Sequence, residues 1–321
     1  MKNRKDVRWA ISILLIFLVL FLGLYAYTQI EVSRIEGKYP PVGEFASTAH
    51  GEVEIHYLRR GSGTPVVMLH GRDGTLQEFT LSIFDIVADH YEAIALDRPG
   101  YGYSECLDPD QLTTKAQARL INEALTKLDV ERPIMLGHSY GAAVMLQYLL
   151  DYPDQVSGAI SLGGVAFVDE PPEEGFFALP RYPVIGPLLT NTVVVPFGRH
   201  VARGIYEQAF WPAEVPEKYI QTIASLYLRP AQFTATSLEL AAMHYSVEQV
   251  SRRYDEISVP VTIIFGDSDQ MLDYRQDGQR LYERVPQASL VLVEDAGHKV
   301  HHTHPEVVME AIARLAGKIE Q

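Results

Sequence analysis

Short apolar runs alternate with longer amphipathic segments along most of the chain, starting near residue 51. Seven runs have the length and composition of β-strands, at 52–59, 65–70, 91–97, 133–137, 156–162, 261–266 and 289–293. Several of them are apolar without a break, which is typical of strands buried on both faces of a parallel sheet. Five segments with helical periodicity lie between them, at 77–89, 113–128, 140–152, 274–284 and 305–316. The pattern predicts an α/β fold in which helices cover both faces of a mostly parallel sheet.

The alternation breaks between residues 169 and 256. This stretch holds nine of the 19 prolines and has helical patches but no strand pattern. Because the strand pattern resumes at residue 261, we interpret 169–256 as a helical insertion, or cap, in a core formed by 49–168 and 257–321. Insertions at the carboxyl edge of such a sheet commonly cover the active site.

An uncharged apolar run precedes this pattern at residues 9–30. At about 1.5 Å of helical rise per residue it reaches roughly 33 Å, enough to cross a hydrocarbon core of about 30 Å. Four cations and one aspartate occupy residues 1–8, whereas the flank after the run is neutral. We therefore predict a cytoplasmic stub and a single transmembrane anchor over 1–30, a linker over 31–48, and export of the rest of the chain to the periplasmic or extracellular side.

Two other interpretations of the apolar run stay open. A cleaved signal peptide has a shorter apolar region that ends in a small-x-small site, and residues 24–28 fit such a site poorly. A buried helix of a soluble protein is the third interpretation.

Composition narrows the class of protein. With 47% hydrophobic and 21% charged residues, the chain is globular rather than collagen-like or disordered. A net charge of −14 argues against a nucleic-acid partner, because phosphate binding needs a positive face. The single cysteine, Cys106, excludes an internal disulfide.

The candidate chemistry centres on the pentapeptide Gly-His-Ser-Tyr-Gly at 137–141, which follows an apolar strand and precedes an apolar-periodic helix. This is the context of a Gly-x-Ser-x-Gly nucleophile elbow, where a strained turn presents a serine at the sheet edge. The glycines are needed because side chains two residues either side of the serine would collide. Ser139 is therefore the candidate nucleophile, near the positive end of the following helix. A serine helix cap with incidental glycines is the alternative.

A serine hydroxyl needs a base that a third group orients. Two carboxylates, Asp267 and Asp269, follow the sixth predicted strand, and His298 follows the seventh. These strand ends lie at the edge where the serine is expected, and the order Ser, Asp, His is one that serine hydrolases use. Asp169, after the strand that precedes the cap, is a third candidate acid, because a triad is defined by geometry and not by position.

Four separated motifs give residues 51–316 a resemblance to the α/β-hydrolase fold superfamily. They are His-Gly-Arg-Asp-Gly at 70–74, Asp-Arg-Pro-Gly-Tyr-Gly-Tyr-Ser at 97–104, the elbow at 137–141 and Ala-Gly-His at 296–298.

The resemblance implies an enzyme that acts through a catalytic triad and needs no cofactor. It assigns Ser139 as nucleophile, His298 as general base and acid, and Asp269 as orienting carboxylate, because relatives place the acid third after the strand-ending glycine. The backbone N–H groups of Arg72 and Tyr140 would form the oxyanion hole.

The serine at the elbow excludes the haloalkane dehalogenases and epoxide hydrolases of this fold, which use an aspartate there. Ester, thioester, lactone and amide hydrolases remain, together with carbon–carbon bond hydrolases, perhydrolases and lyases that use the same triad. We expect a small or medium, mostly apolar ester that is cleaved through an acyl-enzyme. A membrane-tethered binding protein without turnover is the alternative from another class.

Four residues are candidate substrate contacts. Arg72 stands where relatives frequently have an apolar residue, and it would pair either with an anionic group of the substrate or with Asp73 or a cap carboxylate. The cap aromatics, Phe210 and Trp211 among them, either line an apolar pocket or pack the cap onto the core. His138, beside the serine, is the fourth candidate.

Further histidines, His301, His302 and His304, lie close to His298 in the sequence. A metal would compete with the triad for the imidazole, and the cluster has no cysteine. We therefore expect a solvated face and no metal.

Overall fold

The apolar runs of the sequence form a sheet with the strand order β1-β2-β4-β3-β5-β6-β7-β8. The structure, a computed structural model, describes residues 2–48, 53–106, 108–172 and 175–319. Within this part of the chain β2 pairs antiparallel with β1 and β4, and the other neighbouring strands are parallel. The strands are β1 (Glu44–Ser47), β2 (Glu54–Arg60), β3 (Pro65–Leu69), β4 (Glu92–Leu96), β5 (Ile134–His138), β6 (Gly158–Leu162), β7 (Val261–Gly266) and β8 (Ala288–Val293). The predicted α/β fold with a mostly parallel sheet is confirmed.

Helices cover both faces of the sheet, because consecutive strand residues are apolar on both sides. Val66 and Val67 of β3, for example, point into different cores. One core lies between the sheet and α4 (Thr114–Lys127), α5 (Tyr140–Asp151) and α11 (Arg280–Arg284). The other lies between the sheet and α2 (Gln77–Thr80), α3 (Phe84–Ala88) and α13 (Pro305–Ile319), next to the short α12 (Val300–Thr303).

Three elements differ from the sequence-based expectation. The strand β1 was not predicted, because it has four residues and only Ala46 is buried. The predicted helix 77–89 is divided into two short helices, α2 and α3. The sequence does not show the break, because the apolar residues of the two helices together have the spacing of one longer helix. The predicted helix 274–284 begins as a π-helical turn, Arg275–Gln279, before α11.

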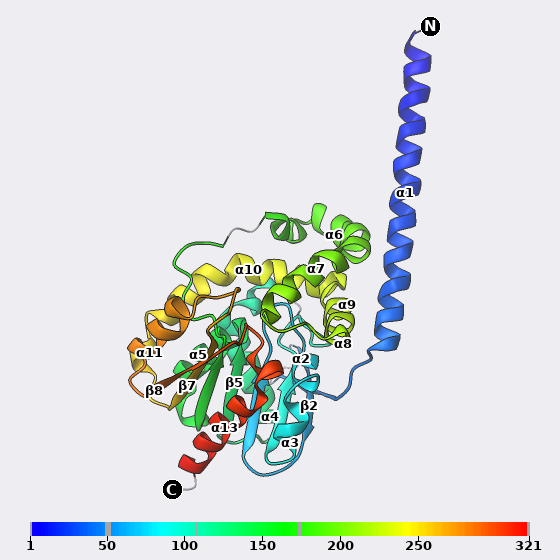
Figure 1. The fold of residues 1–321 in the computed structure, drawn as a ribbon. Coiled ribbons are helices and arrows are strands. Elements are labelled where there is room, and N and C mark those ends of the chain that lie inside the picture. Colours follow the sequence, from blue (N-terminus) through cyan, green and yellow to red (C-terminus); the bar gives the residue numbers. More distant parts are fainter. Residues whose placement is uncertain (1, 49–52, 107, 173–174, 320–321) are drawn as a thin grey trace.

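The segment 169–256, which we propose as the cap, lies across one end of the sheet (Figure 1). Every secondary-structure element that the structure describes in it is a helix or a helical turn. No strand occurs in the part of this segment that the structure describes. Its main helices are α6 (Ile185–Leu189), α7 (Val195–Phe210), α8 (Glu217–Tyr219), α9 (Ser225–Tyr227) and α10 (Pro230–Ser251). The π-helical turn η4 (Thr190–Val194) joins α6 to α7.

The N-terminal helix α1 (Lys2–Lys38) projects from the body of the molecule beside the cap (Figure 1). Among the described residues, Asp6–Lys38 is long and apolar enough to cross a membrane by length and composition. The side chains of Thr28 and Ile35 are buried, and α1 contacts η4, α7 and α9 of the cap. The expected linker 31–48 is therefore wrong in part: this packing continues the helix to Lys38, and β1 follows.

Candidate active site

Ser139 lies at the turn between β5 and α5 with φ 53° and ψ −124°, a conformation that residues other than glycine rarely adopt. A Cβ on Gly137 would lie 2.6 Å from the Cα of Ala142, and one on Gly141 would lie 2.4 Å from the carbonyl oxygen of Leu69. Both positions therefore require glycine. The close approach of strand and helix leaves Ser139 at the carboxyl end of β5, as the motif predicts.

His298 and Asp269 come together from two other strand ends. Nδ1 of His298 lies 2.8 Å from Oδ2 of Asp269, and Oδ1 accepts hydrogen bonds from the backbone N–H groups of Met271 (2.7 Å) and Leu272 (3.0 Å). Burial acts to raise the pKa of Asp269, but His298 and these donors outweigh it and hold the pKa below its ordinary value. An ionised Asp269 can only accept, so His298 donates from Nδ1 and leaves Nε2 to accept a proton.

A cavity of about 290 Å³ opens over Ser139. Arg72, Tyr140 and His298 also line it, so four of the predicted site residues share one cavity, and Asp269 joins them through His298. Much of the remaining wall is apolar. The core contributes Val165, Met271 and Leu272, and the cap contributes Phe177, Ala202, Ile205, Tyr227, Leu240 and Met243.

The two alternative acids lie elsewhere. Asp267 accepts a hydrogen bond from the hydroxyl of its neighbour Ser268 (2.9 Å) in an exposed loop. Asp169 is exposed and pairs with Arg280 at 2.8 Å. Among the three candidate carboxylates, Asp269 therefore has the geometry that orients an imidazole.

The loop 70–74 passes beside Ser139. A Cβ on Gly71 would lie 3.0 Å from the Cβ and 3.5 Å from the Oγ of Ser139. Tyr140 is the first residue of α5, so its N–H has no acceptor within the helix. Arg72 directly follows Gly71, which lies beside the serine hydroxyl, and Tyr140 directly follows Ser139 itself. The two residues predicted to form the oxyanion hole are thus next in sequence to residues at this hydroxyl.

A buried ion pair that the sequence analysis missed holds this loop. Arg98 donates to both carboxylate oxygens of Glu239 in α10 (2.5 and 3.2 Å) and to the carbonyl oxygens of His70 (2.9 Å) and Gly71 (3.2 Å). The hydroxyl of Tyr101 also donates to Glu239 (2.7 Å). Burial opposes the charge of Arg98, but Glu239 outweighs it and raises the pKa of the guanidinium. In the sequence Glu239 is one polar residue of a long helix, with no sign of its partner 141 residues away.

A second buried charge cluster lies against His298, whose ring is 4.8 Å from that of His138. Glu78 in α2 accepts a hydrogen bond from the ammonium of Lys299 (2.6 Å). Nδ1 of His138 and Nε2 of His301 lie 3.0 and 3.3 Å from the same carboxylate oxygen. All four side chains are buried.

Two predictions are therefore wrong. His138 does not contact the cavity, because one ring nitrogen faces Glu78 and the other lies 3.2 Å from the carbonyl oxygen of His298. His301 does not lie on a solvated face, because its short helix α12 packs into the core beneath Phe79.

Ligand atoms of Glu78, His138 and His301 lie within 4.8 Å of one another, a spacing that suits a metal ion. The ammonium of Lys299 already binds this carboxylate, and its positive charge repels a cation. The absence of a metal stays a prediction.

The aromatic substrate contacts were also wrongly chosen. Phe210 is buried against Tyr219 within the cap, and Trp211 is 55% exposed on the surface; neither lines the cavity. Arg72 does line the cavity, and among the described residues no ion pair joins it to Asp73 or to another acid. Its side chain is thus available to a ligand.

Comparison with known proteins gives a consistent set of matches. A family model described as alpha/beta hydrolase fold matches residues 64–305. The 2-hydroxy-6-oxo-6-phenylhexa-2,4-dienoate hydrolase of Burkholderia cepacia is 24% identical over 262 residues, 78% of this chain and 87% of its own. An esterase structure from Exiguobacterium antarcticum has a TM-score of 0.68 and 23% identity, covering 86% of this chain and 100% of its own. A meta-cleavage product hydrolase structure from Pseudomonas fluorescens has a TM-score of 0.68 and 16% identity, covering 87% and 99%. The two structures share the fold.

Proposed function

The chain belongs to the alpha/beta hydrolase fold family and is a hydrolase, and from this premise we propose that it is a serine hydrolase with the triad Ser139, His298 and Asp269. The observation that carries the proposal is the arrangement of the three residues. Asp269 binds Nδ1 of His298, and His298 shares a cavity with a serine held in a strained turn.

In this mechanism the hydroxyl of Ser139 attacks the substrate carbonyl while Nε2 of His298 takes its proton. Asp269 keeps His298 in the required tautomer and stabilises the imidazolium that forms. The N–H groups of Arg72 and Tyr140 would stabilise the tetrahedral oxyanion, each contributing about 3–4 kcal/mol to the transition state. His298 then protonates the leaving group, and a water activated by the same imidazole hydrolyses the acyl-enzyme.

The apolar wall of the cavity supports an apolar ester as substrate. A carbon–carbon bond hydrolase is the second candidate, because the Burkholderia cepacia relative and the Pseudomonas fluorescens structure bear the names of hydrolases of dienoate and meta-cleavage products. The Arg72 side chain in the cavity would suit the carboxylate of such a substrate.

We also propose that α1 anchors the enzyme in a membrane, with the N-terminus in the cytoplasm and the hydrolase core on the exported side. The length and apolar composition of α1 support the anchor. The basic residues that precede the apolar run support the orientation.

Labelling of the full chain with a fluorophosphonate tests the triad. Ser139→Ala should abolish labelling and leave the circular dichroism spectrum unchanged, and Ser251→Ala, at the distant end of α10, should label as the wild type does. Cleavage of a p-nitrophenyl ester should fall by several orders of magnitude in both Ser139→Ala and His298→Ala, because triad members act as a unit. Full labelling of Ser139→Ala would disprove the proposal.

The two aspartates of one loop provide a matched pair for the third member. Asp269→Asn should lower kcat by about four orders of magnitude, whereas Asp267→Asn should retain most of the activity because Asp267 is exposed. The reverse result would reassign the acid. A dienoate substrate assayed beside the ester would decide between the two bond classes.

A further inference from the structure

The cap carries an exposed apolar face that the proposed catalysis does not use. Val184 precedes α6 and is 80% exposed, and Leu188 within α6 is 49% exposed. Phe197 and Val201 in α7 are 59% and 62% exposed. The helices α6 and α7 lie next to each other in the cap (Figure 1), and large apolar side chains this exposed on neighbouring helices mark a surface that contacts a partner or a membrane.

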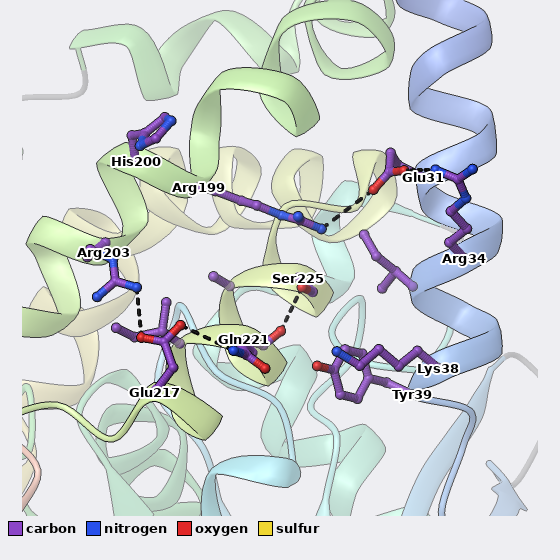
Figure 2. A pocket seen from close by; sticks show the side chains of 13 residues that line it. Glu31, Arg34, Lys38, Tyr39, Arg199, His200, Arg203, Glu217, Gln221 and Ser225 are labelled. Atoms are coloured by element: carbon purple, nitrogen blue, oxygen red, sulfur yellow. Dashed lines mark hydrogen bonds and ion pairs between the residues drawn. The ribbon is translucent and has the colours of Figure 1, made fainter.

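The helix α7 is amphipathic along this face. Phe197, Val201 and Ile205 follow one another at four-residue spacing and so share one side of the helix. Arg199 and Arg203 lie on another side of the helix. Figure 2 shows Arg199 extending toward Glu31 of α1 and Arg203 toward Glu217. A helix with apolar residues on one side and arginines on another is typical of the interface between lipid and water.

A groove of about 300 Å³ runs into the apolar face, and its walls are almost entirely apolar. Phe197 and Val201 lie in its walls together with Phe177, Ala202 and Ile205. The last three, and Tyr227, also line the cavity over Ser139. The groove and the catalytic cavity are thus adjacent and separated by shared side chains.

Contacts with α1 fix the depth of this face relative to the apolar run. Gln29 of α1 donates a hydrogen bond to Asn191 (3.0 Å), two residues after α6. Phe21 and Leu24 are less exposed than their neighbours. They lie seven and four residues before the buried Thr28 and therefore on the same side of the helix. The side of α1 that packs on the cap thus extends well into the apolar run 9–30. Figure 1 shows α6 farther along α1, toward its N-terminus, than α8 and α9.

Basic residues begin where the apolar run ends. A pocket between α1 and the cap is lined by Arg34 and Lys38 from α1 and by Arg199 and Arg203 from α7 (Figure 2). Glu31 pairs with Arg34 and Arg199, and Glu217 with Arg203, so the cations outnumber the two carboxylates. Arg34 lies about 6 Å beyond the end of the apolar run at Ile30, which is the level of lipid head groups if α1 spans the bilayer.

We propose that the apolar face of α6 and α7 inserts into the bilayer that α1 spans, and that its groove leads the acyl chain of a membrane-dissolved ester to Ser139. This inference rests on the proposed function and adds the substrate class and its route. Hydrolysis with one water gives a fatty acid and an alcohol, and the acid is left in the groove beside the bilayer. An acyl lipid is the occupant that fits this surface. The apolar face of α6 and α7 lies beside the helix α1 that would span the membrane, and cations border it at the level of the lipid head groups.

The first test measures the depth of the face in the full chain. In a Cys106→Ser background, Ile185→Cys and Tyr282→Cys carry an environment-sensitive fluorophore. Both native side chains are 47% exposed, and Tyr282 lies on α11, well away from α6 and α7 (Figure 1). In phosphatidylcholine vesicles with some phosphatidylglycerol, lipids brominated on the acyl chain should remove more than half of the emission at 185 and leave that at 282 unchanged. Equal quenching at both sites, or disulfide-linked dimers of the unlabelled Ile185→Cys protein, would overturn the inference, the latter in favour of a second copy of the chain.

The second test measures the route of the substrate. Val184→Asp/Leu188→Asp should lower, by about ten-fold, the ratio of the rate on a vesicle-dissolved palmitoyl ester to the rate on a soluble butyrate ester, because charges oppose insertion. Tyr282→Asp should leave the ratio unchanged. Val201→Trp, which fills the groove, should lower the palmitate-to-butyrate ratio about ten-fold for esters dispersed in detergent.

The outcomes separate the two proposals. The proposed route of the substrate would be overturned if the palmitate-to-butyrate rate ratios were unaltered in the variants, or if the wild type did not cleave the palmitoyl ester. The fluorophosphonate labelling would still support a serine hydrolase in either case. An unlabelled Ser139 would disprove the hydrolase mechanism, whereas the depth measurement does not depend on catalysis.

Discussion

Removing the carboxylate of Glu239 is the perturbation whose effect the structure specifies most fully. Glu239 accepts from both terminal nitrogens of Arg98, from Tyr101 and, at 2.8 Å, from Gln117. Neither side chain of the Arg98–Glu239 pair is exposed. In Glu239→Ala the guanidinium would stay buried and keep only the oxygen of Gln117 and two backbone carbonyls as acceptors.

Breaking a buried ion pair by removing one partner costs about 3–5 kcal/mol, because the remaining charge is left without compensation. Each kcal/mol lowers Tm by about 2–4 °C in domains of about 150–250 residues, and a larger chain lies at the lower limit, which gives a decrease of roughly 6–10 °C. The matched control is Glu248→Gln on the same helix. Its exposed pair with Arg252 (2.6 Å) contributes only about 0.3–0.5 kcal/mol.

Glu239→Ala should also impair catalysis at temperatures where it is folded. Arg98 holds the carbonyl groups of His70 and Gly71, directly before Arg72 of the proposed oxyanion hole. A displacement of about 1 Å in such a loop can reduce the rate 100-fold. The loss should appear in kcat rather than in KM, and Glu239→Gln, which keeps one acceptor, should recover part of it.

Urea unfolding and ester kinetics on the full chain in detergent measure both effects. Glu239→Ala with the same urea midpoint as Glu248→Gln would refute the energetic argument. A destabilised Glu239→Ala with wild-type kcat would show that Arg98 supports the cap but does not position the loop.

Three further predictions concern acidity, specificity and topology. Burial lowers the pKa of His70 and His138 to about 4 and that of His301 to about 3. Unfolded histidines bind a proton below about pH 6.5, so the free energy of unfolding should fall as the pH falls from 6.5 to 4, and the urea midpoint should be lower at pH 5 than at pH 7. Arg72→Ala should raise KM more for anionic than for neutral esters, and an equal increase for both would contradict a role in binding the anion. A reporter fused after Gln321 should be active only in the exported compartment; cytoplasmic activity would contradict the orientation.

The sequence predicts those parts of the molecule that depend on local pattern. The Gly-x-Ser-x-Gly turn is encoded within five residues, because its glycines meet atoms of the adjacent helix and strand. The parallel strands are recognisable because they are mostly apolar, and β3 is apolar throughout. The edge strand β1 has neither property, since its four residues pair only with β2 and only Ala46 is buried.

The missed residues of the site depend on contacts between distant segments. Glu78 and Lys299 are 221 residues apart, and each is a single charged residue in an otherwise ordinary helix or loop. The side on which His138 points is decided by that pair and not by the motif around it. Likewise, Phe210 is one of many cap aromatics, and only the packing of the cap distinguishes it from Phe177, which does line the cavity.

The helix α10 ties together three parts of the molecule, and this limits how the cap can move. Arg229, directly before it, pairs with Glu36 of α1 at 3.3 Å. One turn later, Gln232 donates to the carbonyl oxygen of Gly74 in the loop beside Ser139 (3.1 Å), and Glu239 binds Arg98. Movement of α10 would break a buried ion pair and displace the loop, whereas α7, which also lines the cavity, is held to α8 by the exposed pair Arg203–Glu217, so the cavity opens at lower cost on the side of α7. That half of the cap carries the apolar groove, and a membrane would contact the part of the enzyme that is able to open.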